Sequence, residues 1–218
     1  MAHAHHFKLK NGATRLERIV HVVRAGGVGV MPTDTIYGIV GSALDSKAVE
    51  RVYRVRRRNP KKPVIILIGS MNDLALFGIA PPARVKKKLG AWWPGKVSVV
   101  LSLPQRKSKK KKPAGLGAPA ADFAYLHRGT KTLAFRVPKP AWLRGLLTAT
   151  GPLIAPSANV EGEAPARTVR EAKNYFGDAI DFYLDGGARD SKPSTLVKLE
   201  RGKPVVLRRG AARNPRFF

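Results

Sequence analysis

Short runs of apolar, mostly β-branched residues recur along the 218-residue chain, and helical patterns lie between them. Residues 64–68 form one such continuous run, which is typical of a strand buried on both faces. Residues 14–25 instead repeat apolar side chains at helical spacing and stop at Gly26 and Gly27. Because strands and helices are interspersed without a strict strand–helix–strand repeat, the sequence predicts a single α/β domain with a mixed sheet.

The same patterns predict the remaining elements. Further helices are expected at residues 46–57, 73–78, 83–89, 141–148 and 168–176. Strands are expected at residues 28–31, 39–44, 97–103, 133–137, 153–155, 180–184, 195–199 and 205–207. Asp45 or Ser46 is the expected N-cap of the second helix, and Thr168 with Glu171 has the spacing of a capping box.

The chain divides into one domain and three segments of other character. Residues 14–212 are expected to form the domain, after a flexible segment at 1–13 and before a tail at 213–218. Residues 104–121 include four consecutive lysines and a tract rich in Pro, Gly and Ala. Since so many like charges repel and cannot be buried, this stretch is expected to be a low-complexity insertion at the surface.

Composition restricts the compartment and the partners. The chain has 41 Lys and Arg against 14 Asp and Glu, a net charge of +27, which attracts polyanions but does not distinguish a specific RNA site from a generally basic protein. It has no cysteine, which excludes disulfides and thiolate metal sites and fits the cytoplasm. No apolar run approaches the roughly 20 residues that span a bilayer, so no membrane segment is expected.

The sequence lacks the residues that several classes of reaction require. There is no Gly-rich loop ending in Lys-Ser or Lys-Thr, so a P-loop nucleotidase is excluded. His21 and His127 lie far apart without a nearby carboxylate cluster, so no protein metal site is expected. A Gly-x-Ser-x-Gly nucleophile and an obvious carboxylate pair are also missing, which argues against esterase and glycosidase chemistry.

Three polar clusters remain at the ends of predicted strands and helices, where α/β sheets bind ligands. Residues 33–38 combine hydroxyls and a carboxylate, which suits a small polar ligand but equally suits a turn. Residues 56–62 are rich in Arg and Lys, which can grip phosphate or simply complement a helix C-terminus. Residues 157–159, Ser-Ala-Asn, can bind phosphate or ribose or form a turn.

Taken in order, the motifs of the chain resemble those of the short, single-domain members of the YrdC-like family. The matching pieces span about residues 14–212 and form a specific set: Gly26-Gly27, Pro32 through Gly38, Arg56-x-Arg58, Trp93-Pro94-Gly95, Ala134 through Pro138, Ser157-x-Asn159, Asp185-Gly186-Gly187, Ser194-Thr195 and Leu207 through Gly210.

The resemblance implies a twisted mixed sheet with flanking helices around a large open cavity, and the activity of a threonylcarbamoyl-AMP synthase. In that reaction L-threonine and bicarbonate give N-carboxythreonine, which attacks the α-phosphate of ATP and releases pyrophosphate. A partner threonylcarbamoyl transferase then passes the group to a tRNA adenosine. One alternative is a non-catalytic member of the family that binds RNA, either tRNA or double-stranded RNA, which the net charge favours. A second alternative is an enzyme of related fold that uses a different carbamoyl substrate.

The resemblance also implies roles for individual residues. Threonine is expected to contact Thr35, Tyr37, Arg136 and Ser194. ATP is expected to contact Arg56, Arg58, Lys62, Thr132, Ser157, Asn159 and Arg208, of which Arg56, Arg58, Ser157 and Asn159 are the expected catalytic set. Mg²⁺ is expected to arrive with ATP, held mainly by phosphate oxygens and water. At position 56 the family usually has lysine, so arginine there keeps the charge in a different shape.

Overall fold

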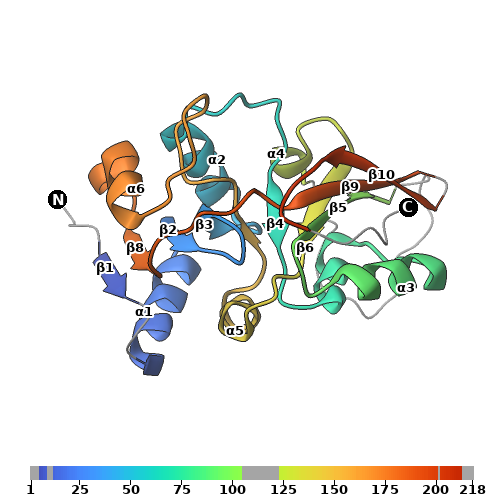
Figure 1. Ribbon diagram of the computed structural model, residues 1–218, viewed down its shortest axis with the longest axis horizontal. Coiled ribbons are helices and arrows are strands. Elements are labelled where there is room, and N and C mark those ends of the chain that lie inside the picture. Colours follow the sequence, from blue (N-terminus) through green and yellow to red (C-terminus); the bar gives the residue numbers. More distant parts are fainter. Residues whose placement is uncertain (1–4, 9–11, 105–122, 201, 213–218) are drawn as a thin grey trace.

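The computed structural model describes residues 5–8, 12–104, 123–200 and 202–212 of the chain, and of residues 5–14 only the backbone. Within these ranges ten strands form one mixed sheet, in the order β1-β8-β2-β3-β7-β4-β6-β5-β9-β10 (Figure 1). The strands are β1 His5–Lys8, β2 Gly29–Pro32, β3 Tyr37–Ser42, β4 Ile65–Leu67, β5 Val97–Ser102, β6 Thr132–Arg136, β7 Leu153–Ile154, β8 Phe182–Asp185, β9 Thr195–Glu200 and β10 Lys203–Arg208. The predicted mixed α/β fold is confirmed.

The sheet mixes both pairing directions. Four neighbouring pairs are parallel, namely β1 with β8, β8 with β2, β4 with β6, and β5 with β9. The other neighbours run antiparallel. Each parallel pair needs a long crossover connection, and this need explains why helices alternate with strands along the chain.

Helices cover both faces of the sheet (Figure 1). The helices are α1 Gly12–Arg24, α2 Ser46–Val55, α3 Ala83–Trp92, α4 Ala124–His127, α5 Ala141–Thr150 and α6 Val169–Phe176, with 3₁₀ turns η1 Met71–Phe77 and η2 Gly177–Ala179. One apolar cluster joins α1 and α5 to the sheet, with fully buried Ile19, Leu143 and Leu147. A larger cluster joins α2, α6 and the 3₁₀ turn η1 to the strands.

Local capping agrees with most of the sequence predictions. Asp45 caps α2 by accepting hydrogen bonds from the backbone N–H groups of Lys47 and Ala48. Thr168 caps α6 by accepting from the N–H of Glu171, at a distance of 3.2 Å. The segment predicted as a helix at 73–78 is instead the 3₁₀ turn η1, and Ser70 caps it.

The N-terminal segment differs from its prediction. Residues 1–13 were expected to be flexible, yet His5–Lys8 forms the edge strand β1 and α1 already begins at Gly12. The physical reason is the exposed backbone of β8, which offers N–H and C=O groups to a parallel partner. Apart from Pro104, the basic insertion predicted at 104–121 lies outside the described residues, as does the predicted tail at 213–218.

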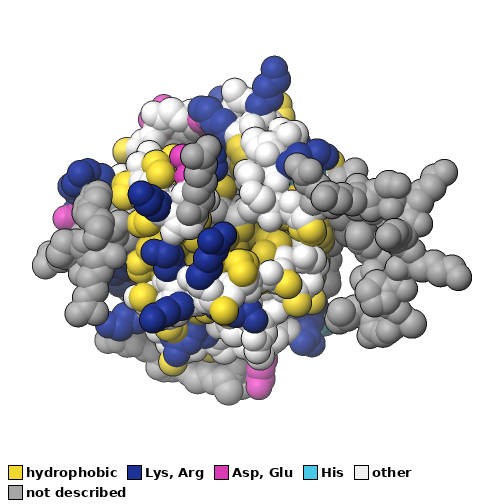
Figure 2. Space-filling model, turned by 90° about the vertical axis from the view of Figure 1, so that its right-hand side faces the viewer, with side chains coloured by type: hydrophobic (Ala, Val, Ile, Leu, Met, Phe, Trp, Pro, Cys, Tyr) yellow, Lys and Arg dark blue, Asp and Glu magenta, His cyan; other side chains and the backbone are white. Residues whose placement is uncertain are grey.

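Across the described ranges, no helix has both the length and the apolar character needed to cross a membrane. Figure 2 shows the end of the molecule that carries α3 and β10, where Lys and Arg side chains far outnumber Asp and Glu. This end of the surface is therefore basic, in keeping with the net charge of the chain.

Candidate functional site

A cavity of about 330 Å³ lies on one face of the central strands. Its floor includes Thr132, Ala134 and Arg136, which alternate along β6, while Leu133 and Phe135 between them are buried on the other face. This alternation follows from the two-residue period of a strand. The walls come from the β2–β3 loop, from the connection before β4, from the turn after β7 and from β9 and β10. Such a volume lies within the range of small-molecule sites.

A buried ion pair organises one end of the cavity. The Arg136 guanidinium lies 2.9 Å from a carboxylate oxygen of Asp34, and the two side chains are only 5% and 4% exposed. The same guanidinium donates a hydrogen bond of 3.1 Å to the hydroxyl of Thr35. Burial lowers the pKa of Arg136, and the charge of Asp34 opposes that shift. The guanidinium is therefore held in a fixed position, and the buried carboxylate of Asp34 favours its charged form.

Hydrogen bonds within the β2–β3 loop fix the hydroxyl groups next to this ion pair. The Thr33 hydroxyl donates to the carbonyl of Ile36 at 2.7 Å and accepts from the backbone N–H of Thr35 at 3.1 Å. The two threonine hydroxyl oxygens are themselves 3.1 Å apart. Because Thr33 and Thr35 are 5% and 2% exposed, their orientation is set before any ligand binds.

The segment just before β9 supplies another part of the wall. The Ser194 hydroxyl is 2.8 Å from that of Ser98 on β5, and both side chains are buried. Arg208 on β10 donates to the carbonyl of Ser194 at 3.0 Å and also lines the cavity. Burial lowers the pKa of Arg208. The guanidinium of Arg208 thus belongs to the same wall as Ser194 although fourteen positions separate them in the sequence.

Arg58 and Ser157 line the cavity from two further loops. Arg58 donates hydrogen bonds to the carbonyls of Lys62 and Pro63, which anchors its guanidinium beside β4. Ser157 follows β7 and forms a bridge to Gly38 of β3. Two separate motifs therefore meet at this wall because β3 and β7 are neighbours in the sheet.

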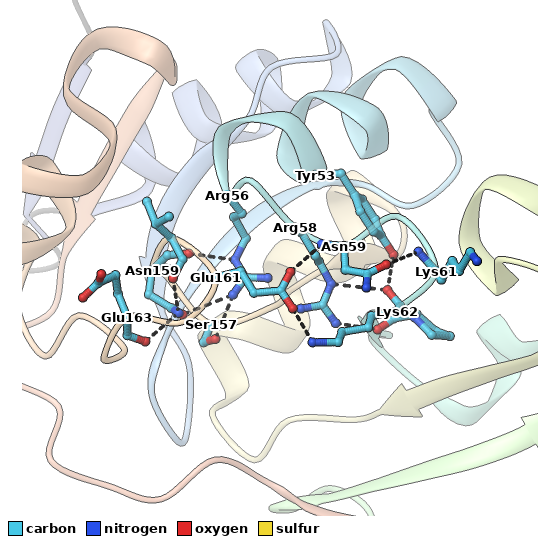
Figure 3. Close-up of polar contacts among 12 residues, drawn as sticks. Tyr53, Arg56, Arg58, Asn59, Lys61, Lys62, Ser157, Asn159, Glu161 and Glu163 are labelled. Atoms are coloured by element: carbon cyan, nitrogen blue, oxygen red, sulfur yellow. Dashed lines mark hydrogen bonds and ion pairs between the residues drawn. The ribbon is translucent and has the colours of Figure 1, made fainter.

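Arg56 lies behind this wall rather than in the cavity (Figure 3). It is 2% exposed and donates to the carbonyl and the side-chain oxygen of Asn159, at 3.0 and 3.2 Å, and to the hydroxyl of Ser157 at 3.3 Å. Burial lowers the pKa of Arg56 to about 10, and the nearby charge of Arg58 acts in the same direction. Arg56 therefore connects the end of α2 to the Ser-x-Asn turn.

Three other predicted residues also lie outside the cavity lining. Asn159 is 5% exposed, and its amide donates to the carbonyls of Val160 and Glu163. The Lys62 ammonium pairs with Glu161 at 2.5 Å. The Tyr37 hydroxyl donates to the carbonyl of Gly187 at 2.8 Å, which ties β3 to the segment after β8.

The structure thus brings together seven of the predicted residues around one cavity: Thr35, Arg58, Thr132, Arg136, Ser157, Ser194 and Arg208. Sequence reasoning placed Thr33 and Asp34 only in a cluster that suits a small polar ligand, where they support Thr35 and Arg136. It singled out neither Ser98, which bonds Ser194, nor Glu161, which pairs with Lys62. Asp34 and Glu161 carried one signal, because each is a rare acid inside or beside a motif of an acid-poor chain. Ser98 carried none, since a serine within a strand has no distinguishing pattern.

Comparison with known proteins identifies the family. The family model described as Telomere recombination, which covers Sua5, YciO and YrdC proteins, matches residues 21–210. The chain belongs to this Sua5/YciO/YrdC family. The resemblance inferred from the ordered motifs is therefore confirmed.

Individual members of the Sua5/YciO/YrdC family resemble the chain over most of its length. A threonylcarbamoyl-AMP synthase of Halorhodospira halophila is 30% identical over 196 residues, which cover 88% of this chain and 91% of that protein. The structure of Pyrococcus abyssi Sua5 complexed with L-threonine has a TM-score of 0.79 and 25% identity, covering 95% of this chain and 57% of that one. Escherichia coli YciO, at 24% identity, shares the fold over the full length of both chains with a TM-score of 0.78.

Proposed function

We propose that this protein is a threonylcarbamoyl-AMP synthase, a nucleotidyltransferase that uses L-threonine, bicarbonate and ATP. The observation that carries the proposal is the gathering of three guanidinium groups, Arg58, Arg136 and Arg208, with the hydroxyls of Thr35 and Ser157 around one cavity. No Asp or Glu is among the described residues that line it. A site of this charge suits two anionic reactants, one relative is named threonylcarbamoyl-AMP synthase, and the Pyrococcus abyssi Sua5 structure contains L-threonine.

Threonine is placed at the end that holds the buried ion pair. Its carboxylate faces the guanidinium of Arg136 and the hydroxyl of Thr35, which Asp34 and Thr33 keep in position. Ser194, which also lines the cavity, offers a hydroxyl to the polar groups of the amino acid. Tyr37, by contrast, acts through the backbone after β8 that it holds.

The nucleotide is placed against Arg58, Thr132, Ser157 and Arg208, which line the same cavity. Guanidinium groups and hydroxyls of this kind bind phosphate oxygens and ribose hydroxyls. Arg56 is assigned a positioning role, in which it orients the Ser-x-Asn turn without touching the nucleotide. Arginine serves there because a lysine has no planar fork with which to bond the carbonyl, the amide oxygen and the hydroxyl together.

In the reaction, a carboxylate oxygen of N-carboxythreonine forms a bond to the α-phosphorus of ATP while the bond from that phosphorus to the β-phosphate oxygen breaks. Pyrophosphate leaves with the electron pair. The nucleophile is already an anion, so the protein needs to align two anions and screen their charge rather than remove a proton. The guanidinium groups of Arg58 and Arg208 do this beside the phosphates.

Mg²⁺ fits the proposal as a companion of ATP. Within the ranges that the structure describes, no group of three or more His, Cys, Asp or Glu could hold a metal, and the cavity lining offers hydroxyls without carboxylates. The ion would therefore be bound by phosphate oxygens and water, and the hydroxyls of Ser157 and Thr132 on the cavity wall could supply protein oxygens. When bound, Mg²⁺ would neutralise part of the negative charge of the phosphates.

The product, threonylcarbamoyl-AMP, is a mixed anhydride that needs an acceptor. We infer a partner threonylcarbamoyl transferase that delivers the group to tRNA, and we place the reaction in the cytoplasm, in keeping with the absence of cysteine. Direct contact with tRNA or double-stranded RNA would use the basic end of the surface (Figure 2).

Pyrophosphate release tests the proposal. We expect release that requires ATP, threonine and bicarbonate together, and a loss of about 100-fold or more in Arg58→Ala or Ser157→Ala, the size seen when one group that stabilises developing charge is removed. Arg170→Ala, on the exposed face of α6, is the matched control and is expected to retain full activity. Absence of threonylcarbamoyl-AMP in the wild type, together with steeply salt-dependent RNA binding, would instead support the RNA-binding alternative.

A further inference from the structure

An anion-binding site is already formed beside the cavity, and a carboxylate of the protein itself fills it (Figure 3). One side-chain oxygen of Glu161 lies 2.5 Å from the ammonium of Lys62. The other accepts a short hydrogen bond from the backbone N–H of Asn59. The backbone N–H of Glu161 in turn donates to the carbonyl of Arg56, which fixes the residue against the end of α2.

The donors that hold Glu161 are those that bind phosphate in proteins. An ammonium group and a main-chain N–H, with a guanidinium nearby, form the usual environment of a phosphate oxygen. The hydrogen bonds from Lys62 and Asn59 lower the pKa of Glu161, with a further contribution from the charge of Arg58. The carboxylate is therefore ionised and occupies the place where an anionic ligand would receive the same donors.

We propose that Glu161 is an internal competitor for the phosphate groups of the substrate and of the product. In the free protein it holds Lys62 away from the cavity, and the polyphosphate end of a bound ligand takes Lys62 and the Asn59 N–H in its place. The inference rests on the proposed function, because it places the β- and γ-phosphates next to residues 58–62. The consequence is weaker retention of pyrophosphate, and so faster release of that product.

The Lys62–Glu161 contact has the geometry that such an exchange needs. The Lys62 side chain is 59% exposed and that of Glu161 is 23% exposed, so the pair can open without disturbing the core. An exposed ion pair contributes little to stability, and a multiply charged anion readily competes with it. The neighbouring Arg58 stays anchored to the carbonyls of Lys62 and Pro63, so the main chain of the site remains in position while the ammonium moves.

Pyrophosphate binding to the free, full-length protein, measured by isothermal titration calorimetry, tests the inference without turnover. In Glu161→Gln we expect the Kd of pyrophosphate to fall by about threefold, the order of size of one exposed ion pair. In a Lys62→Met background the same change is expected to have a smaller effect, because only the backbone N–H of Asn59 is then left for Glu161 and pyrophosphate to compete for. Glu163→Gln is the matched control, since it removes an exposed carboxylate from the same loop and is expected to leave the Kd unchanged.

A purely structural role for Glu161 predicts the opposite sign. If the carboxylate only pinned residues 59–62, then Glu161→Gln would raise the Kd of pyrophosphate, and that result, or an unchanged Kd, overturns the inference. Glu161→Asp provides a second variant that keeps the charge at a shorter reach, with an intermediate Kd expected. Synthase activity with an unchanged pyrophosphate Kd in Glu161→Gln would reject the competitor alone. Tighter binding without any adenylate formation would reject the proposed reaction alone.

Discussion

Asp34→Asn removes the counter-charge of a buried guanidinium and keeps the size of the side chain. In the wild type, Asp34 and Arg136 lie 2.9 Å apart with 4% and 5% of their side chains exposed, so water screens the pair very little. The substituted amide turns a donor group or a neutral oxygen toward Arg136. The guanidinium would then stay charged and buried without a compensating carboxylate, which is the costly half of a broken ion pair.

The expected size follows from this burial. Removal of one partner of a buried pair costs about 3–5 kcal/mol of unfolding free energy, and no discount for solvent applies at this exposure. For a domain of this length, each kcal/mol lowers Tm by about 2–4 °C, so the expected decrease in Tm is roughly 6–20 °C. In the proposed site the threonine carboxylate faces Arg136 and would replace the missing charge, so saturating L-threonine is expected to raise Tm more in the variant than in the wild type.

Thermal unfolding followed by circular dichroism, with and without L-threonine, measures both effects. Asp190→Asn is the matched control, because Asp190 pairs with Arg167 at the surface, where the side chains are 82% and 59% exposed, and a change below about 1 kcal/mol is expected. Asp34→Asn combined with Arg136→Met removes both charges and should be less destabilised than Asp34→Asn alone. A change in Tm as small as that of the control, or a double variant no more stable than the single one, would refute the reasoning.

Three further outcomes are expected. Ser98→Ala leaves the buried hydroxyl of Ser194 without its partner, so the KM of threonine should rise severalfold with little change in kcat. Ser102→Ala, at the exposed end of the same strand, should change neither constant, and an equal KM in the two variants would contradict this role of Ser98. At Gly145 in α5 an added Cβ meets open space, so Gly145→Ala should raise the unfolding free energy by about 0.5–1 kcal/mol because alanine favours a helix more than glycine does. Urea denaturation measures this change, and a loss of stability would contradict the open space at this position. The pKa of Glu161 is lowered in the folded protein, so its ionised carboxylate contributes stability above the pKa that Glu161 has in the unfolded chain. That stability is lost as pH falls through the lower pKa of the folded protein. Glu161→Gln should therefore flatten the acid side of the Tm–pH profile, and an unchanged profile would contradict this.

Most of the elements could be predicted because their signals are local. The periodicity of residues 14–25, the apolar run at 64–68 and the cap at Asp45 each depend on neighbours in the sequence, and each is present within a few residues of its expected bounds. The strand β1 could not be predicted in this way. His5–Lys8 pairs only because β8, far along the chain, leaves an edge open to it.

The candidate site divides in the same way. The sequence by itself determined which residue types are available, because the motifs from Thr33 to Arg208 contain the hydroxyls and guanidinium groups of the site. The order of these motifs also indicates the family. Only the tertiary structure decided which of them share a cavity. It placed Arg136 in the cavity and Arg56 behind it, although both are arginines in matching motifs.

The reason is the order of the strands. The neighbouring strands β3, β7, β4, β6, β5 and β9 are not consecutive in the sequence, so side chains from distant segments become neighbours. Within each strand, the alternation of side chains decides which face of the sheet a residue occupies. Arg136 lies on β6 with its side chain on the cavity face, where Asp34 holds it. Arg56 follows α2, and the hydrogen bonds that it donates to Asn159 and Ser157 turn it toward the protein interior. The motifs thus determined the chemistry, and the packing of distant strands determined which groups can perform it.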